Sequence, residues 1–155
     1  MGALTGYRVL DLSRVLAGPW CGQTLADLGA EVIKVERPGV GDDTRGWGPP
    51  WMKGQDDERT SEASYYQSTN RGKLSVALNL ASPQGQELVR ALATDCDVLI
   101  ENYKAGSLAK YGLDYASLAQ LNPRLVYCSV TGFGQTGPRA AEPGYDFIVQ
   151  GIGGL

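Results

Sequence analysis

The stretch RVLDLSRVLAGPWCGQTLADLGAEVIKVERP, residues 8–38, decides the fold class of this chain. Its first apolar run, residues 9–12, has the composition of a buried strand. Residues 17–19, Ala-Gly-Pro, predict a turn that opens a helix, because proline suits the first helical turn, where no N–H partner is needed. Gly29 ends that helix, and residues 32–35 predict a second strand. This order of elements predicts a βαβ unit and hence a parallel sheet.

Charged residues follow both strands. Arg14 comes after the first strand, close to the helix start, and Arg37 comes after the second. The carboxyl ends of parallel strands share one edge of the sheet, where open α/β proteins bind their ligands. Two arginines and a helix N-terminus at one edge favour an anionic ligand.

The rest of the chain continues the alternation of strands and helices. Three further strands are predicted, over residues 74–78, 97–100 and 125–130. Helices are predicted at 65–69, from the Ser82-Pro83 start signal onward, at 105–111, at 115–121 after an Asp114 cap, and from 144 onward. Residues 38–64, rich in Gly, Pro and charge, are predicted to form a long irregular loop. The fold class is therefore α/β, an open and mainly parallel sheet with flanking helices.

Composition excludes several kinds of function. The chain has 155 residues and no histidine, so Ser-His-Asp chemistry and His-ligated metals are not available within it. Its net charge of −3 argues against a general binder of nucleic acids or membrane surfaces. The three cysteines lack CxxC spacing and predict buried free thiols, with no metal site, in a reducing cytosol. We therefore expect a cytoplasmic protein.

Seven cations follow or end the predicted strands: Arg14, Lys34, Arg37, Arg71, Lys73, Lys104 and Lys110. Each one alone is most simply a solvated surface charge, but as a set they predict a ligand that carries phosphate. NAD and FAD are disfavoured, because the turn after the first strand lacks G-x-G-x-x-G, although Glu36 stands where a ribose-binding acid would be. Tyr145 and Asp146 open the last predicted helix. There an acidic residue is favoured by the helix dipole alone, and a catalytic role is the alternative.

Over residues 4–155 the chain resembles the class III coenzyme A transferases, the CaiB/BaiF family. The resemblance rests on RVLDLSRVLAGPW, LADLGAEVIKVERPGVGDDTRGWGPP, YYQSTNRGKLSVALNL, DVLIENYKAGSLAKYGL and YCSVTGFGQTGP with PGYD. It implies a Rossmann-like large domain that holds coenzyme A (CoA), and an interlocked homodimer at full length. It also implies transfer of CoA from an acyl-CoA to a free carboxylic acid through a mixed anhydride and an enzyme–CoA thioester. CoA and acyl-CoA would be substrates, with no permanently bound cofactor.

The resemblance also implies the residues of the site. The CoA-contacting positions would be Arg14, Val15, Leu16, Ala17, Arg37, Leu78, Asn102, Tyr103, Lys110 and Tyr111. The nucleophilic aspartate of the family lies beyond residue 155, so we expect residues 1–155 to be the N-terminal part of the CoA-binding large domain, inactive alone. Tyr145 and Asp146 would have a supporting role near the reacting thioester. The details GDDTR, WGPP and IENY are similar to members that use dicarboxylic acids.

Two other functions stay open. The chain could be a non-catalytic module that binds CoA or another nucleotide. The α-methylacyl-CoA racemases of the same superfamily carry a catalytic histidine where this chain has Tyr145, so the resemblance favours a transferase over an isomerase.

Overall fold

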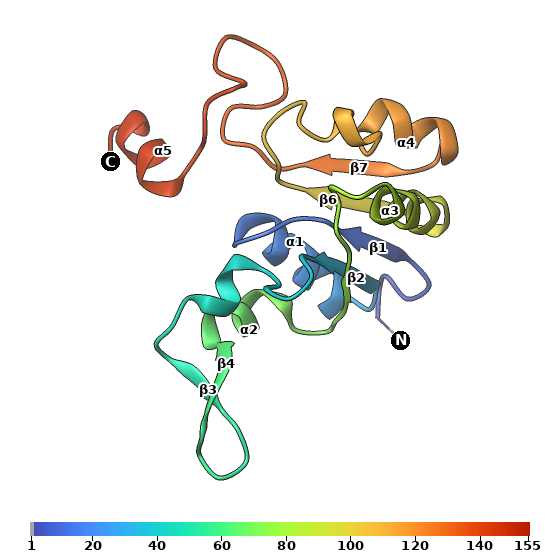
Figure 1. Ribbon diagram of the computed structural model, residues 1–155. Coiled ribbons are helices and arrows are strands. Elements are labelled where there is room, and N and C mark those ends of the chain that lie inside the picture. Colours follow the sequence, from blue (N-terminus) through green and yellow to red (C-terminus); the bar gives the residue numbers. More distant parts are fainter. Residues whose placement is uncertain (1) are drawn as a thin grey trace.

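The computed structural model describes residues 2–155 and is built on a five-stranded sheet (Figure 1). Its strands are β1 (Arg8–Asp11), β2 (Glu31–Glu36), β5 (Lys73–Ala77), β6 (Val98–Glu101) and β7 (Val126–Ser129). They lie in the order β5-β2-β1-β6-β7, and every neighbouring pair is parallel. The predicted open parallel sheet is confirmed, including the βαβ unit at the start of the chain.

Helices cover both faces of this sheet. The helix α1 (Ala17–Asp27) packs on one face, and α3 (Pro83–Asp95) and α4 (Tyr115–Leu121) pack on the other. Neighbouring strand residues point to opposite faces, so Val9 joins the core under α1 while Leu10 joins the core under α3 and α4. Because both faces are covered in β1, β2 and β6, most residues of these strands are buried without alternation, whereas the edge strand β5 is largely exposed.

Two predicted helix starts differ in how they are capped. The Ser82 hydroxyl accepts a hydrogen bond from the Gly85 N–H at 3.1 Å, and Pro83 begins α3 as predicted. Asp114 does precede α4, but its carboxylate accepts from the Ser117 hydroxyl at 2.5 Å and caps no backbone N–H. The helix predicted over 105–111 is wrong in extent, because only the 3-10 turn η2 (Ala109–Tyr111) forms there.

The segment 38–64 is more ordered than predicted. It holds the 3-10 turn η1 (Asp43–Gly46) and an antiparallel hairpin of β3 (Trp51–Lys53) and β4 (Arg59–Ala63). The hairpin projects away from the sheet, and the Arg59 guanidinium lies over the Trp51 ring, 4.0 Å from its centroid (Figure 1). The strand WMK is only three residues long and RTSEA carries a single apolar residue, so hydrophobic periodicity gave no signal for them.

The two remaining helices have different surroundings. The helix α2 (Ser64–Asn70) follows the hairpin and contacts α1. The helix α5 (Asp146–Gly153), predicted from residue 144, stands apart from the sheet on the side of the strands' carboxyl ends, and none of its residues is buried (Figure 1). Of the helices in the described part of the chain, none has the length and apolar character needed to cross a membrane.

The three cysteines are free thiols, as predicted, but their burial differs from the prediction. Only Cys96 is buried, whereas Cys21 and Cys128 are half-buried at the edge of the core under α1.

Candidate functional site

A pocket of about 210 Å³ opens at the carboxyl edge of the sheet. Most of its lining residues lie at the end of a strand or just after one. They are Arg14, Val35, Glu36, Arg37, Gly41, Asp42, Leu78, Asn79, Leu80, Ala81, Tyr103 and Tyr111. Arg14 and Tyr103 follow β1 and β6, the neighbouring strands at which the strand order reverses. Ligands of open parallel sheets bind at this place.

Asp43 bridges the two arginines of the pocket. Its Oδ2 lies 3.2 Å from Arg14 Nη1, and its Oδ1 contacts Arg37 Nη2. The Arg14 guanidinium also lies over the Tyr103 ring, 5.2 Å from its centroid. The side chains of Arg14 and Arg37 are 37% and 50% exposed, so both keep N–H donors that a ligand can reach. One carboxylate between two guanidinium groups leaves a net positive charge, which favours an anion.

Side chains hold the backbone of the turn that carries Arg14. The Asn102 Oδ1 accepts from the Arg14 N–H at 2.8 Å, and the Asn102 Nδ2 donates to the Arg14 carbonyl at 2.6 Å. The Val15 N–H donates to Asp42 Oδ1 at 3.3 Å. Val15 has a φ of 70°, which is rare for a β-branched residue and persists only where the surroundings enforce it.

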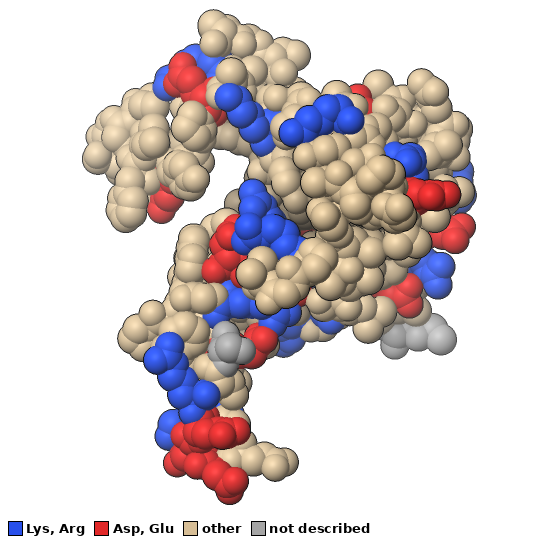
Figure 2. All heavy atoms as spheres, viewed as in Figure 1, with Lys and Arg blue, Asp and Glu red and all other residues tan. Residues whose placement is uncertain are grey.

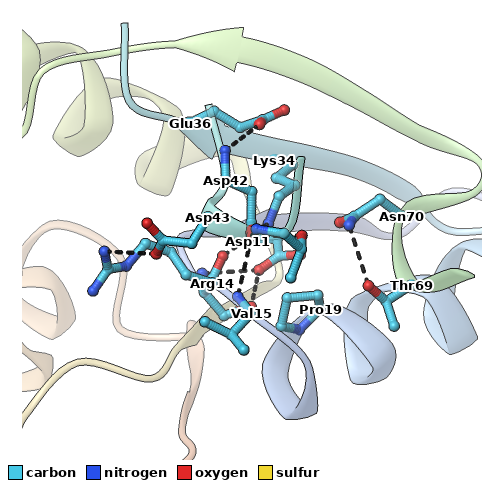
Figure 3. Close-up of polar contacts among 12 residues, drawn as sticks. Asp11, Arg14, Val15, Pro19, Lys34, Glu36, Asp42, Asp43, Thr69 and Asn70 are labelled. Carbon is cyan, nitrogen blue, oxygen red and sulfur yellow. Dashed lines mark hydrogen bonds and ion pairs between the residues drawn. The ribbon is translucent and has the colours of Figure 1, made fainter. Parts of the chain in front are cut away.

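Two buried ion pairs lie close to this turn, and Figure 3 labels Lys34 and Asp42 of the first pair and Asp11 of the second. Lys34 Nζ lies 2.9 Å from Asp42 Oδ2, and Lys73 Nζ lies 2.8 Å from Asp11 Oδ2. All four side chains are at most 2% exposed. Burial alone would raise the pKa of Asp42, but the Lys34 ammonium and hydrogen bonds from Thr44 lower it. Lys34 and Lys73 therefore neutralise buried carboxylates and are not free cations for a ligand, which corrects their interpretation as part of a phosphate-binding set.

Glu36, at the end of β2, is fixed by a dense set of donors. Arg45 donates to both carboxylate oxygens at 2.7 Å, and Tyr66, Ser75 and the Asp42 N–H donate as well. Burial alone would raise the pKa of Glu36, but these hydrogen bonds outweigh it and lower the pKa to about 2. Glu36 thus anchors the segment after β2, since Arg45 and the Asp42 N–H of that segment donate to its carboxylate.

A second hollow, of about 660 Å³, lies over the outer edge of the sheet beside β5. Its cations are already engaged: Arg45 pairs with Glu36 and Glu62, Arg71 with Asp27, and Lys73 with Asp11. Figure 2 shows the same mixing on a larger scale, since Lys and Arg side chains lie beside Asp and Glu and the tip of the hairpin is acidic. Recognition of an anion must therefore be local, and the pocket with Arg14 and Arg37 suits it best.

The structure brings half of the predicted CoA-contacting residues together in this pocket: Arg14, Arg37, Leu78, Tyr103 and Tyr111. The other half lie beside it. Asn102 contacts the Arg14 backbone, and Lys110 lies over the Tyr111 ring, 4.7 Å from its centroid. Val15, Leu16 and Ala17 form the turn and the start of α1, whose N-cap, Leu16, makes no side-chain cap.

Tyr145 and Asp146 are placed away from the pocket lining. Tyr145 is 70% exposed at the start of α5, and the Asp146 Oδ1 accepts a hydrogen bond from Gln150 Nε2 at 2.9 Å. Sequence reasoning missed three residues that shape the pocket, Asp11, Asp42 and Asp43. A lysine inside the apolar strand EVIKVE was the available signal, because a charge in a buried strand needs a partner.

Comparison of this sequence with known proteins points to one family. The sequence profile of CoA-transferase family III matches residues 4–155. A succinate–glutarate CoA-transferase of Agrobacterium fabrum is 62% identical over 152 residues, which are 98% of this chain and 38% of that protein. A succinyl-CoA:glutarate CoA-transferase of Mus musculus is 50% identical over all of this chain and 34% of its own length.

A solved structure agrees with the sequence relatives. The crystal structure of a CaiB/BaiF family protein from Brucella suis superposes with a TM-score of 0.93 at 56% identity. The match covers 99% of this chain and 40% of that one. The chain thus spans between a third and two fifths of the length of these relatives. With its profile match, its parallel sheet and this superposition, the chain belongs to CoA-transferase family III.

Proposed function

We propose that this chain supplies the CoA-binding part of an enzyme that moves CoA from an acyl-CoA to a free carboxylic acid. One observation carries the proposal: Arg14 and Arg37 are both partly exposed in one pocket whose other wall is apolar. CoA combines phosphate groups with an adenine ring and an uncharged pantetheine arm, so a single pocket must bind both kinds of surface.

The two walls of the pocket would bind different parts of CoA. Arg14, Arg37 and the uncapped N-terminus of α1 would hold phosphate oxygens, because arginine forks and helix N-termini both favour them. Leu78, Leu80 and Tyr111 would contact the adenine ring or the pantetheine arm. Tyr103 would orient Arg14 through its ring face.

In the proposed reaction of the whole protein, a carboxylate of the enzyme attacks the thioester carbonyl of the acyl-CoA. CoA leaves as a thiolate, and a mixed anhydride of the enzyme carboxylate and the donor acid forms. The thiolate then attacks the carbonyl that came from the enzyme carboxylate, so the donor acid leaves and an enzyme–CoA thioester remains. The acceptor acid regenerates the carboxylate by the same two steps in reverse. We place the nucleophile outside residues 1–155, and Tyr145 and Asp146 in a supporting role near the reacting thioester.

The acceptor in this proposal is a dicarboxylic acid. The relatives that support it are named for succinate, glutarate, mesaconate and oxalate, all of them dicarboxylic acids. In the same proposal the whole enzyme works in the cytoplasm as a homodimer, and residues 1–155 are the N-terminal part of its large domain.

Calorimetry on the 155-residue chain tests the CoA site. We expect CoA to bind more tightly than NAD, and Arg14→Ala or Arg37→Ala to weaken CoA binding roughly ten- to a hundredfold, the range for hydrogen bonds to charged groups. Tighter binding of NAD, or unchanged affinity in both variants, would overturn the assignment. Turnover by the isolated chain would show that the nucleophile lies within it. Racemisation of a 2-methylacyl-CoA by the whole protein would favour the isomerase instead.

A further inference from the structure

The turn Ser13–Arg14–Val15 takes its backbone hydrogen bonds from side chains. Five of its N–H and C=O groups are bound in this way: Ser13 N and O, Arg14 N and O, and Val15 N. Buried backbone groups need partners, and here no strand or helix provides them. The conformation of the turn, including the positive φ of Val15, therefore depends on the side chains that surround it.

Lys34 and Asp42 hold two of these five groups from beneath the turn. Lys34 Nζ donates to the Ser13 carbonyl at 2.9 Å and lies 2.9 Å from Asp42 Oδ2. Asp42 Oδ1 in turn accepts from the Val15 N–H. The ion pair thus contacts the turn on both sides of Arg14, as the close-up in Figure 3 shows for Lys34, Asp42 and Val15.

We propose that the buried Lys34–Asp42 pair is a positioning device for the anion site: it fixes the Ser13–Val15 turn so that the Arg14 guanidinium faces the pocket. The inference rests on the proposed function for its ligand, CoA. The part that concerns the conformation of the turn does not depend on CoA and is tested on the chain without ligand. Two charges that are almost fully buried are costly to desolvate, and an apolar pair of similar volume is often as stable. The role that we assign to these two charges is therefore to fix the conformation of the turn, in addition to any stability that they contribute.

A double variant separates positioning from simple stability. Lys34→Met replaces the four-carbon stem by an unbranched chain of about the same length without the ammonium group, and it leaves Asp42 as an unpaired buried charge, so it destabilises the whole fold. Adding Asp42→Asn removes that charge, while the amide oxygen still accepts from Val15 and Thr44. The Lys34→Met/Asp42→Asn protein therefore holds no unpaired buried charge, but the buried Ser13 carbonyl has lost its donor, so a smaller loss of stability remains.

Asn122→Ala is the matched control. Asn122 is buried, and its Nδ2 donates to the carbonyls of Ala93 at 3.1 Å and Cys96 at 2.8 Å, between the end of α3 and the start of β6. The start of β6 lies at the edge of the sheet opposite the pocket, so this variant loses buried hydrogen bonds without touching the turn.

Three measurements on the 155-residue chain decide the inference: urea unfolding, amide hydrogen exchange of Arg14 and Val15 without ligand, and CoA affinity by calorimetry. In the double variant we expect urea unfolding to become easier to about the same extent as in Asn122→Ala, exchange at the turn to be faster by about tenfold, and CoA binding to be weaker by about tenfold or more. In Asn122→Ala we expect lower stability with unchanged exchange at the turn and unchanged affinity.

Several outcomes would contradict the inference. Slow exchange at the turn in the double variant, or an equal loss of CoA affinity in Asn122→Ala, would show that the ion pair only stabilises the fold. If the unaltered chain bound no CoA, the proposed function would fail, yet the exchange measurement would still decide whether Lys34 and Asp42 position the turn.

Discussion

Asn102 holds Arg14 by both of its backbone polar groups, although the two residues lie 88 positions apart in the sequence. The amide of Asn102 accepts at 2.8 Å and donates at 2.6 Å, and so ties the loop after β6 to the loop after β1. These are the neighbouring strands at which the strand order reverses. The pocket therefore depends on contacts between loops that only the sheet brings together.

Removing this amide tests that dependence. Asn102→Ala loses both hydrogen bonds, and we expect unfolding to become easier by about 1–3 kcal/mol in urea. CoA binding falls as well, because Arg14 is no longer fixed. Asn102→Asp keeps the acceptor for the Arg14 N–H but has no donor for the Arg14 carbonyl, so its loss of affinity should be intermediate. An Asp variant that bound as weakly as the Ala variant would show that the Arg14 carbonyl contact dominates.

Asp43 pairs with both Arg14 and Arg37, so in the proposed site it would compete with CoA for the two arginines. Replacing it by asparagine keeps its shape and removes a negative charge from the pocket, so we expect Asp43→Asn to bind CoA a few-fold more tightly at low salt. The advantage should shrink as salt screens the charges. Asp57→Asn is the control, since Asp57 is 80% exposed at the tip of the hairpin and pairs with Lys53. Weaker CoA binding in Asp43→Asn would show instead that the bridge orients the arginines.

The low pKa of Glu36 makes the fold sensitive to acid. Its pKa is about 2 in the folded chain against 4.5 ordinarily, so the stability that its carboxylate contributes is fully present above about pH 4.5 and is lost as the pH falls toward 2. The shift corresponds to about 3 kcal/mol. Urea unfolding of the wild type and of Glu36→Gln should therefore differ most near pH 6 and converge toward pH 2. A difference independent of pH would exclude this linkage.

The loop between β7 and α5 closes through two glycines. A Cβ atom on Gly132 would overlap the backbone of Gly144, so Gly132→Ala should force the base of the loop apart. We expect faster proteolytic cleavage within residues 131–145. Gly151→Ala serves as the comparison, because a Cβ there meets nothing within 4 Å and alanine favours the helix α5. Equal cleavage of the two variants would mean that the close approach of the two glycines does not hold the loop.

The sequence alone determined the five strands of the parallel sheet, most of the helices and the edge of the sheet at which the candidate pocket lies. Apolar strand runs and the Ser82-Pro83 helix start are local signals, readable without knowing which strands are neighbours. The resemblance to a known family added Leu78, Tyr103 and Tyr111 of the pocket. The role of Tyr145 and Asp146 stays a prediction, since nothing in the fold of this chain tests it.

The tertiary structure decided which charges are open to a ligand and which are buried within the fold. Lys34 and Arg37 lie three positions apart near the end of β2, yet Lys34 is buried against Asp42 while Arg37 is half-exposed in the pocket. From the sequence, both residues are predicted only as cations near the end of a strand. Both partners, Asp42 and Asp43, come from the loop directly after β2, so the distance along the sequence does not separate the two cations. They differ because Lys34 lies inside β2 beneath the Ser13–Val15 turn, where water is excluded, whereas Arg37 follows the strand and reaches the pocket, and only the tertiary structure decides which position is covered.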